Sequence, residues 1–146
     1  MANLMNDNVV DRPQTRSSDK IASENTPVET EPFVVIVVLN WQQAQLTTEC
    51  VKSLLALEYS IFQILIVDNG SQDGSTAVLQ GLLSSRVSLV CLDQNLGYAG
   101  GNNAGIRYAL EHNADYVLVL NNDTIVSPGL LTTLTRAAAS DRSVAA

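Results

Sequence analysis

An apolar run that ends in amide and carboxylate side chains is the part of this sequence best suited to chemistry. Residues 116–120 form the run, and Asn121, Asn122 and Asp123 follow it directly. A β-branched and aliphatic run of this kind is typical of a central strand buried on both faces. Ligands of open parallel sheets bind beyond the carboxyl ends of the strands, where Asp123 can hold a hard divalent cation and, through it, a phosphate. The alternative is that Asn121 and Asp123 form a turn before the next helix.

Two further apolar runs end in polar side chains. Asn40 and Trp41 follow the run at 33–39, and Asp68 follows the run at 61–67. Because the carboxyl ends of parallel strands meet at one edge of a sheet, we expect these side chains to share one crevice with those that follow residue 120. Asp68 can accept N–H groups there from a ligand such as a nucleobase. The alternative for Asp68 is an Asx turn with the glycine two residues later.

A glycine-rich stretch at 95–105 follows a third expected strand at 87–92. It lacks the G-x-G-x-x-G fingerprint of dinucleotide-binding proteins after the first strand, and the chain has no G-K-[ST] phosphate loop. One interpretation is a helix start whose free N–H groups and small side chains allow close approach of a phosphate or a sugar. The other is close packing of the helix on the sheet through Gly101 and Gly105.

Strands and helices alternate along residues 33–146, which predicts one α/β domain with parallel βαβ units. Helices are expected at 43–57, from 73 to about 83, from the glycine-rich stretch to 113, and at 128–140. We expect their apolar sides to face the sheet; these residues are Leu46, Cys50, Val51, Leu54 and Leu55, then Val78, Leu79, Leu82 and Leu83, then Ile106, Tyr108, Ala109 and Leu110, then Leu130, Leu131, Leu134 and Ala137.

The two ends of the chain differ from this pattern. Residues 1–32 carry six acids, three bases and almost no apolar periodicity, so we expect a disordered polar leader. Residues 144–146 resemble the start of another strand, so the domain is expected to be truncated at its C-terminus.

Composition narrows the classes of function. The net charge of −7 among 146 residues disfavours a nucleic-acid partner, which requires a basic face. Cys50 and Cys91 lie in apolar segments, as buried free thiols of a cytoplasmic protein do. No stretch is apolar for long enough to span a bilayer. Because no nucleophile with a paired base stands out, chemistry by positioning and a metal-held leaving group is favoured.

Four motifs together resemble family 2 glycosyltransferases, and most closely the bacterial rhamnosyltransferase-type members. They are VIVVLNW at 35–41, VDNGSQDGS at 67–75, NLGYAGGNNAG at 95–105 and LVLNNDT at 118–124. The resemblance covers nearly all of residues 33–146. It implies a GT-A fold, which is a Rossmann-like, mostly parallel sheet flanked by helices. It also implies inverting transfer from a nucleotide-diphosphate sugar with Mg²⁺ or Mn²⁺ as cofactor.

The same resemblance assigns roles to individual residues. Asn40 and Trp41 would border the nucleobase, and Asp68 would accept its ring N–H. Asp123 matches the last acid of the family's D-x-D motif and would hold the metal, while Asn121 replaces the first acid. The remaining substrate-binding positions that it implies are Asn95, Gly97, Gly101, Asn102, Asn103 and Asn122. The family's catalytic base and acceptor site lie downstream, so no catalytic residue is assigned and the isolated chain is expected to have little or no transfer activity.

These expectations describe a cytoplasmic enzyme of cell-surface polysaccharide synthesis. Its donor would be a dTDP- or UDP-linked sugar, with rhamnose as one candidate, and its acceptor a glycan or a lipid-linked glycan. Peripheral association with the inner face of the plasma membrane stays open, as does the oligomeric state. The main alternative is a non-catalytic module that binds a nucleotide sugar or a partner protein. A dinucleotide-dependent oxidoreductase is disfavoured by the missing fingerprint.

Overall fold

Strands and helices alternate along the chain from residue 34 onward. The computed structural model describes residues 3–5 and 31–140. Its strands and helices are β1 (Asn3–Met5), β2 (Val34–Asn40), α1 (Ala44–Leu55), β3 (Phe62–Asp68), α2 (Ser75–Gln80), β4 (Val87–Cys91), α3 (Gly97–Glu111), β5 (Tyr116–Asn121) and α4 (Leu130–Ser140). Each predicted strand and helix of residues 33–140 is present, and the bounds differ from the predictions by a few residues.

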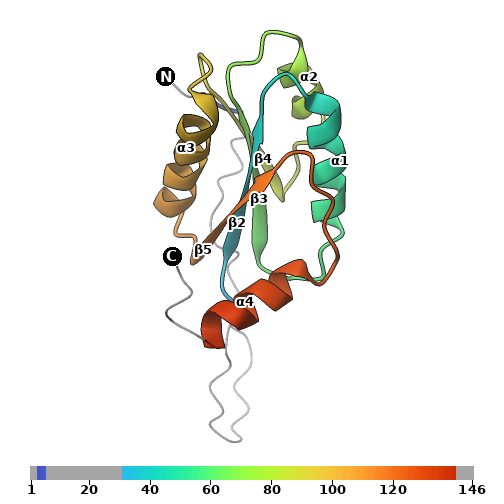
Figure 1. The fold of residues 1–146 in the computed structure, drawn as a ribbon, viewed down its shortest axis with the longest axis vertical. Coiled ribbons are helices and arrows are strands. Elements are labelled where there is room, and N and C mark those ends of the chain that lie inside the picture. Colours follow the sequence, from blue (N-terminus) through green and yellow to red (C-terminus); the bar gives the residue numbers. More distant parts are fainter. Residues whose placement is uncertain (1–2, 6–30, 141–146) are drawn as a thin grey trace, which may run out of the picture.

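The strands form one five-stranded sheet in the order β1-β4-β3-β2-β5 (Figure 1). Strands β2, β3, β4 and β5 are parallel to one another, as expected for this fold class. On β2, Asn40 lies opposite Asp68 of β3, and Leu39 lies opposite Asn121 of β5. The carboxyl ends of these three strands therefore meet at the same edge of the sheet.

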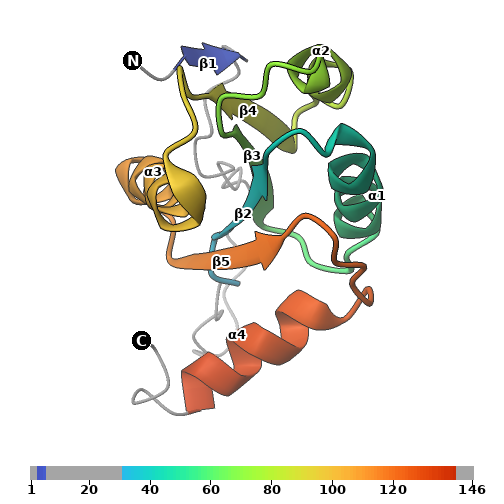
Figure 2. The ribbon, with the colours of Figure 1, turned by 45° about the horizontal axis from the view of Figure 1, so that its top comes forward.

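Helices cover both faces of the sheet. Figure 2 shows α1 and α2 on one face and α3 on the other. One apolar core lies under α1 and includes Leu54 and Ile64, while a second lies under α3 and includes Val37 and Val67. The predicted doubly covered parallel sheet is confirmed, and its buried strands consist mainly of Val, Ile and Leu.

Helix α3 lies unusually close to the sheet, because two of its glycines face β2 and β3. A Cβ atom placed on Gly105 would lie 2.4 Å from a methyl carbon of Val37, and one placed on Gly101 would lie 2.4 Å from a methyl carbon of Leu39. Real Cβ atoms do not approach other carbons so closely. The packing interpretation of these two glycines is therefore confirmed.

The prediction of a central position for strand 116–120 was wrong. Strand β5 is at the edge of the sheet and pairs only with β2 among the described residues. Its residues are half-buried or exposed, and Val119 is 37% exposed. The strand that is buried along its whole length is β3. Apolar composition identified the strand correctly, but it does not encode how many neighbours a strand has.

Several residues predicted to face the sheet are exposed instead. On α1 the buried residues are Thr47, Cys50, Val51 and Leu54, so the buried stripe is rotated from the prediction and includes a threonine. The threonine is tolerated because its hydroxyl has hydrogen-bond partners at the top of the sheet, which are described below. The exposed residues are Leu46, Leu55, Val78, Leu110, Leu134 and Ala137.

The expected leader is described only in part. Residues Asn3–Met5 form β1, which pairs antiparallel with β4. These three residues are therefore a strand, contrary to the prediction, because main-chain hydrogen bonds to an open sheet edge do not depend on apolar composition. Residues 6–30 lie outside the described part, and so do residues 144–146, where a truncated strand was expected.

Candidate functional site

A cavity of about 240 Å³ lies at the carboxyl edge of the sheet. It is open to solvent between the ends of β2, β3 and β5 and the start of α3, where the sequence predicted a crevice. Its lining residues are Leu39, Trp41, Gln43, Asn69, Asn95, Gly97, Tyr98, Asn121 and Asn122. Five of these were predicted from the sequence, namely Trp41, Asn95, Gly97, Asn121 and Asn122.

The other predicted residues do not line the cavity. Asn40, Asp68 and Asn102 are buried, and Gly101 is buried against the sheet. Asn103 is exposed on α3. Asn102 donates a hydrogen bond to the carbonyl of Tyr98 at 3.0 Å. These five residues therefore lie outside the cavity lining, and their contact with a ligand stays a prediction.

Asp68 is the clearest difference between expectation and structure. Its side chain is 1% exposed and accepts hydrogen bonds from Asn40 Nδ2 at 3.0 Å, from the Ser71 hydroxyl and from the Thr76 hydroxyl. A buried carboxylate requires such donors, because leaving it unpaired would cost several kcal/mol. The carboxylate therefore holds together the loop after β3 and the end of β2, and it is not available to a nucleobase here.

The hydrogen bonds continue from Asp68 toward the cavity. Asn40 Oδ1 accepts a hydrogen bond from the Thr47 hydroxyl at 2.7 Å, and Thr47 Oγ1 in turn accepts one from Asn122 Nδ2 at 3.0 Å. Asn40 and Thr47 are fully buried. A connected series of side chains thus runs from the end of β3, through β2 and α1, to the residue after β5. Thr47 was missed from sequence, although its spacing from Cys50, Val51 and Leu54 places it on the buried side of α1.

Asn69, the residue directly after β3, attaches the glycine-rich loop to the sheet. Its Nδ2 donates hydrogen bonds to Asn95 Oδ1 at 2.9 Å and to the Gly97 carbonyl at 3.1 Å, and its Oδ1 accepts one from the Leu96 N–H at 2.9 Å. The start of α3 is therefore fixed at the cavity, where its N–H groups and dipole favour an anionic ligand.

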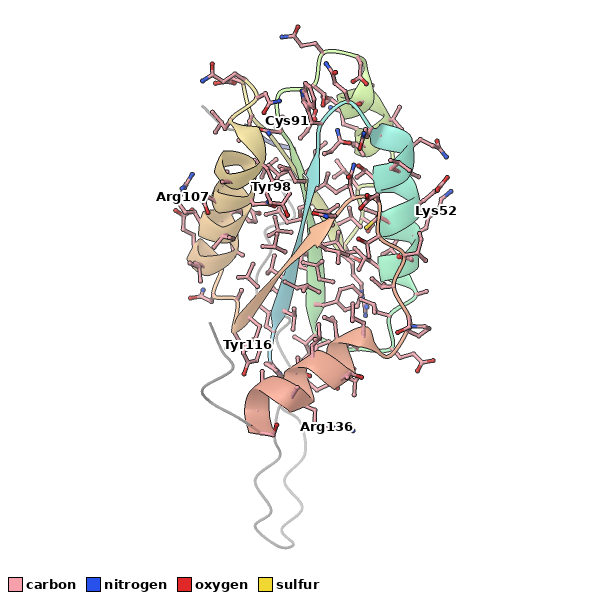
Figure 3. All side chains as sticks on the ribbon, in the orientation of Figure 1. Lys52, Cys91, Tyr98, Arg107, Tyr116 and Arg136 are labelled. Carbon is pink, nitrogen blue, oxygen red and sulfur yellow. The ribbon has the colours of Figure 1, made fainter. Side chains whose placement is uncertain are left out.

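Like Thr47, Tyr98 was missed by sequence reasoning. It lies in the first turn of α3, is 64% exposed, and extends toward the end of β5 (Figure 3). Its hydroxyl donates a hydrogen bond to Asn121 Oδ1 at 2.9 Å. This contact joins two sides of the cavity.

Asp123 is exposed at the same edge, two residues beyond the end of β5. It accepts no hydrogen bond from the described residues. Its charge and, more strongly, burial raise the pKa of the Cys50 thiol to about 11. Cys50 and Cys91 are free, as predicted.

The residues present fit a cation that is held partly by the protein and partly by the phosphates of a bound substrate. Within residues 3–5 and 31–140, no group of three His, Cys, Asp or Glu side chains could hold a metal ion. A complete protein cage is therefore absent from the described part. Mg²⁺ commonly binds through one or two carboxylates together with substrate phosphates and water, and an exposed Asp123 beside the cavity suits that arrangement.

The described part of the chain also contains no helix with both the length and the apolar character that crossing a membrane requires.

Solved structures with the same arrangement define the fold as GT-A. A mannosyltransferase from Pyrobaculum calidifontis, in complex with GDP-Man and Mn²⁺, superimposes with a TM-score of 0.65 and 19% identity over 73% of this chain and 32% of its own. TarS 1–349 from S. aureus, in complex with UDP-GlcNAc, superimposes with a TM-score of 0.64 and 16% identity over 75% of this chain and 32% of its own.

The family model for glycosyl transferase family 2 matches residues 33–146, so the chain belongs to that family. The succinoglycan biosynthesis protein ExoO of Rhizobium meliloti is 32% identical over 104 residues, which cover 71% of this chain and 29% of that protein. Glycosyltransferase GlyG of Streptococcus pneumoniae is 27% identical over 70% of this chain and 34% of its own length. The chain thus spans about a third of these curated relatives.

Proposed function

We propose that this chain forms the donor-binding part of an inverting glycosyltransferase that uses a nucleotide-diphosphate sugar and a divalent cation. The observation that carries the proposal is the cavity at the joint carboxyl edge of β2, β3 and β5, with Asp123 exposed beside it. Ligands of open α/β sheets bind at such an edge. Membership of family 2 supports a reaction in which a sugar is transferred.

The cavity offers a different group to each part of such a donor. Trp41, which is 50% exposed, provides an aromatic face for the nucleobase. The start of α3, at Gly97, faces the cavity and suits the diphosphate because its dipole favours negative charge. Asn95, Asn121 and Asn122 provide amide groups for sugar hydroxyls and phosphate oxygens.

Asp123 is the proposed protein ligand of the cation. When bound, Mg²⁺ or Mn²⁺ would neutralise the charge that grows on the leaving diphosphate. The complex of the Pyrobaculum calidifontis mannosyltransferase with GDP-Man and Mn²⁺ supports this cofactor class. The chain's own residues would bind and orient the donor, and no described residue is proposed as the base that deprotonates the acceptor.

The acceptor is proposed to be a glycan or a lipid-linked glycan of a cell-surface polysaccharide. The name of ExoO, which refers to succinoglycan biosynthesis, supports this class. A dTDP- or UDP-linked donor, with rhamnose as one candidate sugar, belongs to the same proposal. So does a cytoplasmic location at the inner face of the plasma membrane, because sugar nucleotides are the proposed substrates. By itself, the chain is expected to bind the donor and to transfer it poorly or not at all.

Calorimetric titration with UDP, dTDP and GDP, with and without Mn²⁺, tests the proposal. We expect cation-dependent binding of at least one nucleotide, weakened about tenfold by Asp123→Ala, because one charged ligand of the cation is lost. Glu111→Ala is the matched control, since Glu111 is an exposed acid at the end of α3 that lies away from the cavity. Equal binding by wild type and Asp123→Ala would remove Asp123 from the metal site.

Donor turnover by the full-length protein separates the enzyme from a non-catalytic module. Cation-dependent binding of the nucleotide without any hydrolysis or transfer of its sugar would favour the module.

A further inference from the structure

Asn121 and Asn122 are adjacent, both line the cavity, and each is held by a partner on a different element. An asparagine side chain ends in one acceptor oxygen and one donor nitrogen. Whichever of these groups is bonded to the protein, the other one is left for a ligand. The hydrogen bonds around these two residues therefore determine what the cavity presents.

The orientation of Asn122 follows from the buried carboxylate of Asp68. A carboxylate only accepts hydrogen bonds, so Asn40 must turn its Nδ2 toward Asp68, and its Oδ1 then faces Thr47. Thr47 has one hydroxyl proton, and both neighbours that can receive it are acceptors, namely Asn40 Oδ1 at 2.7 Å and the Gln43 carbonyl at 3.2 Å. Toward Asn122, Thr47 can therefore only accept.

Asn122 consequently gives its Nδ2 to Thr47, at 3.0 Å, and its Oδ1 is left over. That oxygen is not among the buried unpaired atoms of the described residues, so it is not completely buried. In Asn121 the arrangement is reversed, because Oδ1 accepts the hydrogen bond from the Tyr98 hydroxyl. No described residue accepts a hydrogen bond from Asn121 Nδ2.

We propose that Thr47 and Tyr98 are positioning residues that hold the two asparagines in opposite amide orientations. The cavity then presents an N–H₂ donor from Asn121 and a carbonyl acceptor from Asn122. Resting on the proposed function, the donor group suits an oxygen of the diphosphate, and the acceptor suits a hydroxyl of the ribose or the transferred sugar. Two neighbouring residues of one type would thereby recognise chemically opposite groups.

The proposal predicts opposite responses to the same substitution. In Asn121→Asp, the carboxylate can still accept the hydrogen bond from Tyr98. In Asn122→Asp, a carboxylate oxygen faces Thr47 Oγ1, which has no proton to give. Both variants add one negative charge at adjacent positions beside Asp123, so each controls for the charge of the other. We expect Asn122→Asp to lower the melting temperature by about 4 °C or more, and Asn121→Asp to change it by about 1 °C or less.

A spectroscopic measurement tests the role of Thr47 separately from stability. The side-chain amide resonances of Asn122 in a ¹⁵N–¹H spectrum should move in Thr47→Val, which has the same shape without the hydroxyl. They should return to the wild-type position in Thr47→Ser, where the hydroxyl is restored. Unmoved Asn122 resonances in a folded Thr47→Val variant, or equal destabilisation by Asn121→Asp and Asn122→Asp, would overturn the proposed orientations.

Titration with UDP in EDTA, at concentrations high enough to measure the weaker binding that remains without the cation, tests the ligand groups. Asn121→Asp should weaken UDP binding about tenfold, because a donor is replaced by a charge that repels the diphosphate. Tyr98→Phe should weaken it about twofold or threefold, because the amide is no longer held. Uridine, which has no phosphate, should bind the wild type and both variants with the same affinity. Loss of uridine binding in step with UDP would contradict a phosphate contact by Asn121. Failure of UDP, dTDP and GDP to bind the wild type in the presence of Mn²⁺ would contradict the proposed function. The amide orientations would then still be tested by the melting temperatures.

Discussion

Strands β3 and β5 are both apolar, and each has an aspartate at the same edge of the sheet. Asp68 is the last residue of β3, and Asp123 lies two residues beyond the end of β5. β3 lies between β2 and β4 and is buried along its length, so Asp68 is 1% exposed and surrounded by donors. β5 lies at the edge of the sheet, and Asp123 beyond it is exposed. The position of a strand in the sheet therefore decides whether the acid at its carboxyl end is buried among donors or exposed.

The largest expected difference is between the two aspartates. Asp68→Ala leaves the side chains of Asn40, Ser71 and Thr76 without their acceptor, and we expect it to lower the free energy of unfolding by about 3 kcal/mol. Asp123→Ala should change it by less than about 0.5 kcal/mol, because Asp123 is exposed. Urea unfolding followed by circular dichroism measures both. Similar losses in the two variants would contradict the division between a structural and a ligand-facing acid.

A smaller difference is expected between two valines, one in each strand. Val67 of β3 is fully buried, whereas Val119 of β5 is 37% exposed. Val67→Ala should cost about 2 kcal/mol, since it removes buried apolar surface and leaves a cavity, and Val119→Ala less than about 1 kcal/mol. The same unfolding measurement applies, with the two variants as mutual controls. A cost for Val119→Ala as large as for Val67→Ala would mean that β5 is covered in solution.

The smallest expected effect concerns Cys50, which donates a hydrogen bond to the Asn121 carbonyl at 3.8 Å. Burial raises its pKa to about 11, so between pH 9 and pH 11 the unfolded chain loses the thiol proton and the folded chain keeps it. Stability should therefore fall as the pH rises through this range, by about 1 kcal/mol per pH unit. Unfolding curves of wild type and Cys50→Ala at several pH values measure this loss. If the free energy of unfolding falls with pH as steeply in Cys50→Ala as in the wild type, the loss of stability comes from other groups.

Most of the fold could be predicted from the sequence, because apolar runs and helical periodicity report local structure directly. The GT-A class and the predicted strands and helices are confirmed, and the structure has a cavity at the edge of the sheet where a crevice was predicted. The edge position of β5 could not be predicted, since 116–120 is as apolar as a central strand. The burial of Asp68 depends on hydrogen bonds from the Ser71 and Thr76 hydroxyls. Both residues follow Asp68 in the chain, but their hydroxyls reach it only when the loop is folded.

Candidate site residues that directly follow strands were predicted from the sequence, whereas two that lie within helices, Thr47 and Tyr98, were missed. Trp41 and Asn121 follow apolar runs and were found. Thr47 lies within helix α1. Tyr98 lies in the glycine-rich stretch at the start of α3, which was interpreted through its glycines and amide side chains alone. For such residues, a polar side chain at a buried helical spacing is the most useful signal.

The attachment of residues 95–97 to Asn69 has a consequence for how a ligand is received. Three hydrogen bonds from one buried side chain give this side of the cavity its shape in advance, so binding there does not incur an entropic cost for ordering a loop. The opposite side consists of Asn121 and the exposed residues that follow an edge strand. We therefore expect adjustment to larger or smaller ligands at that side.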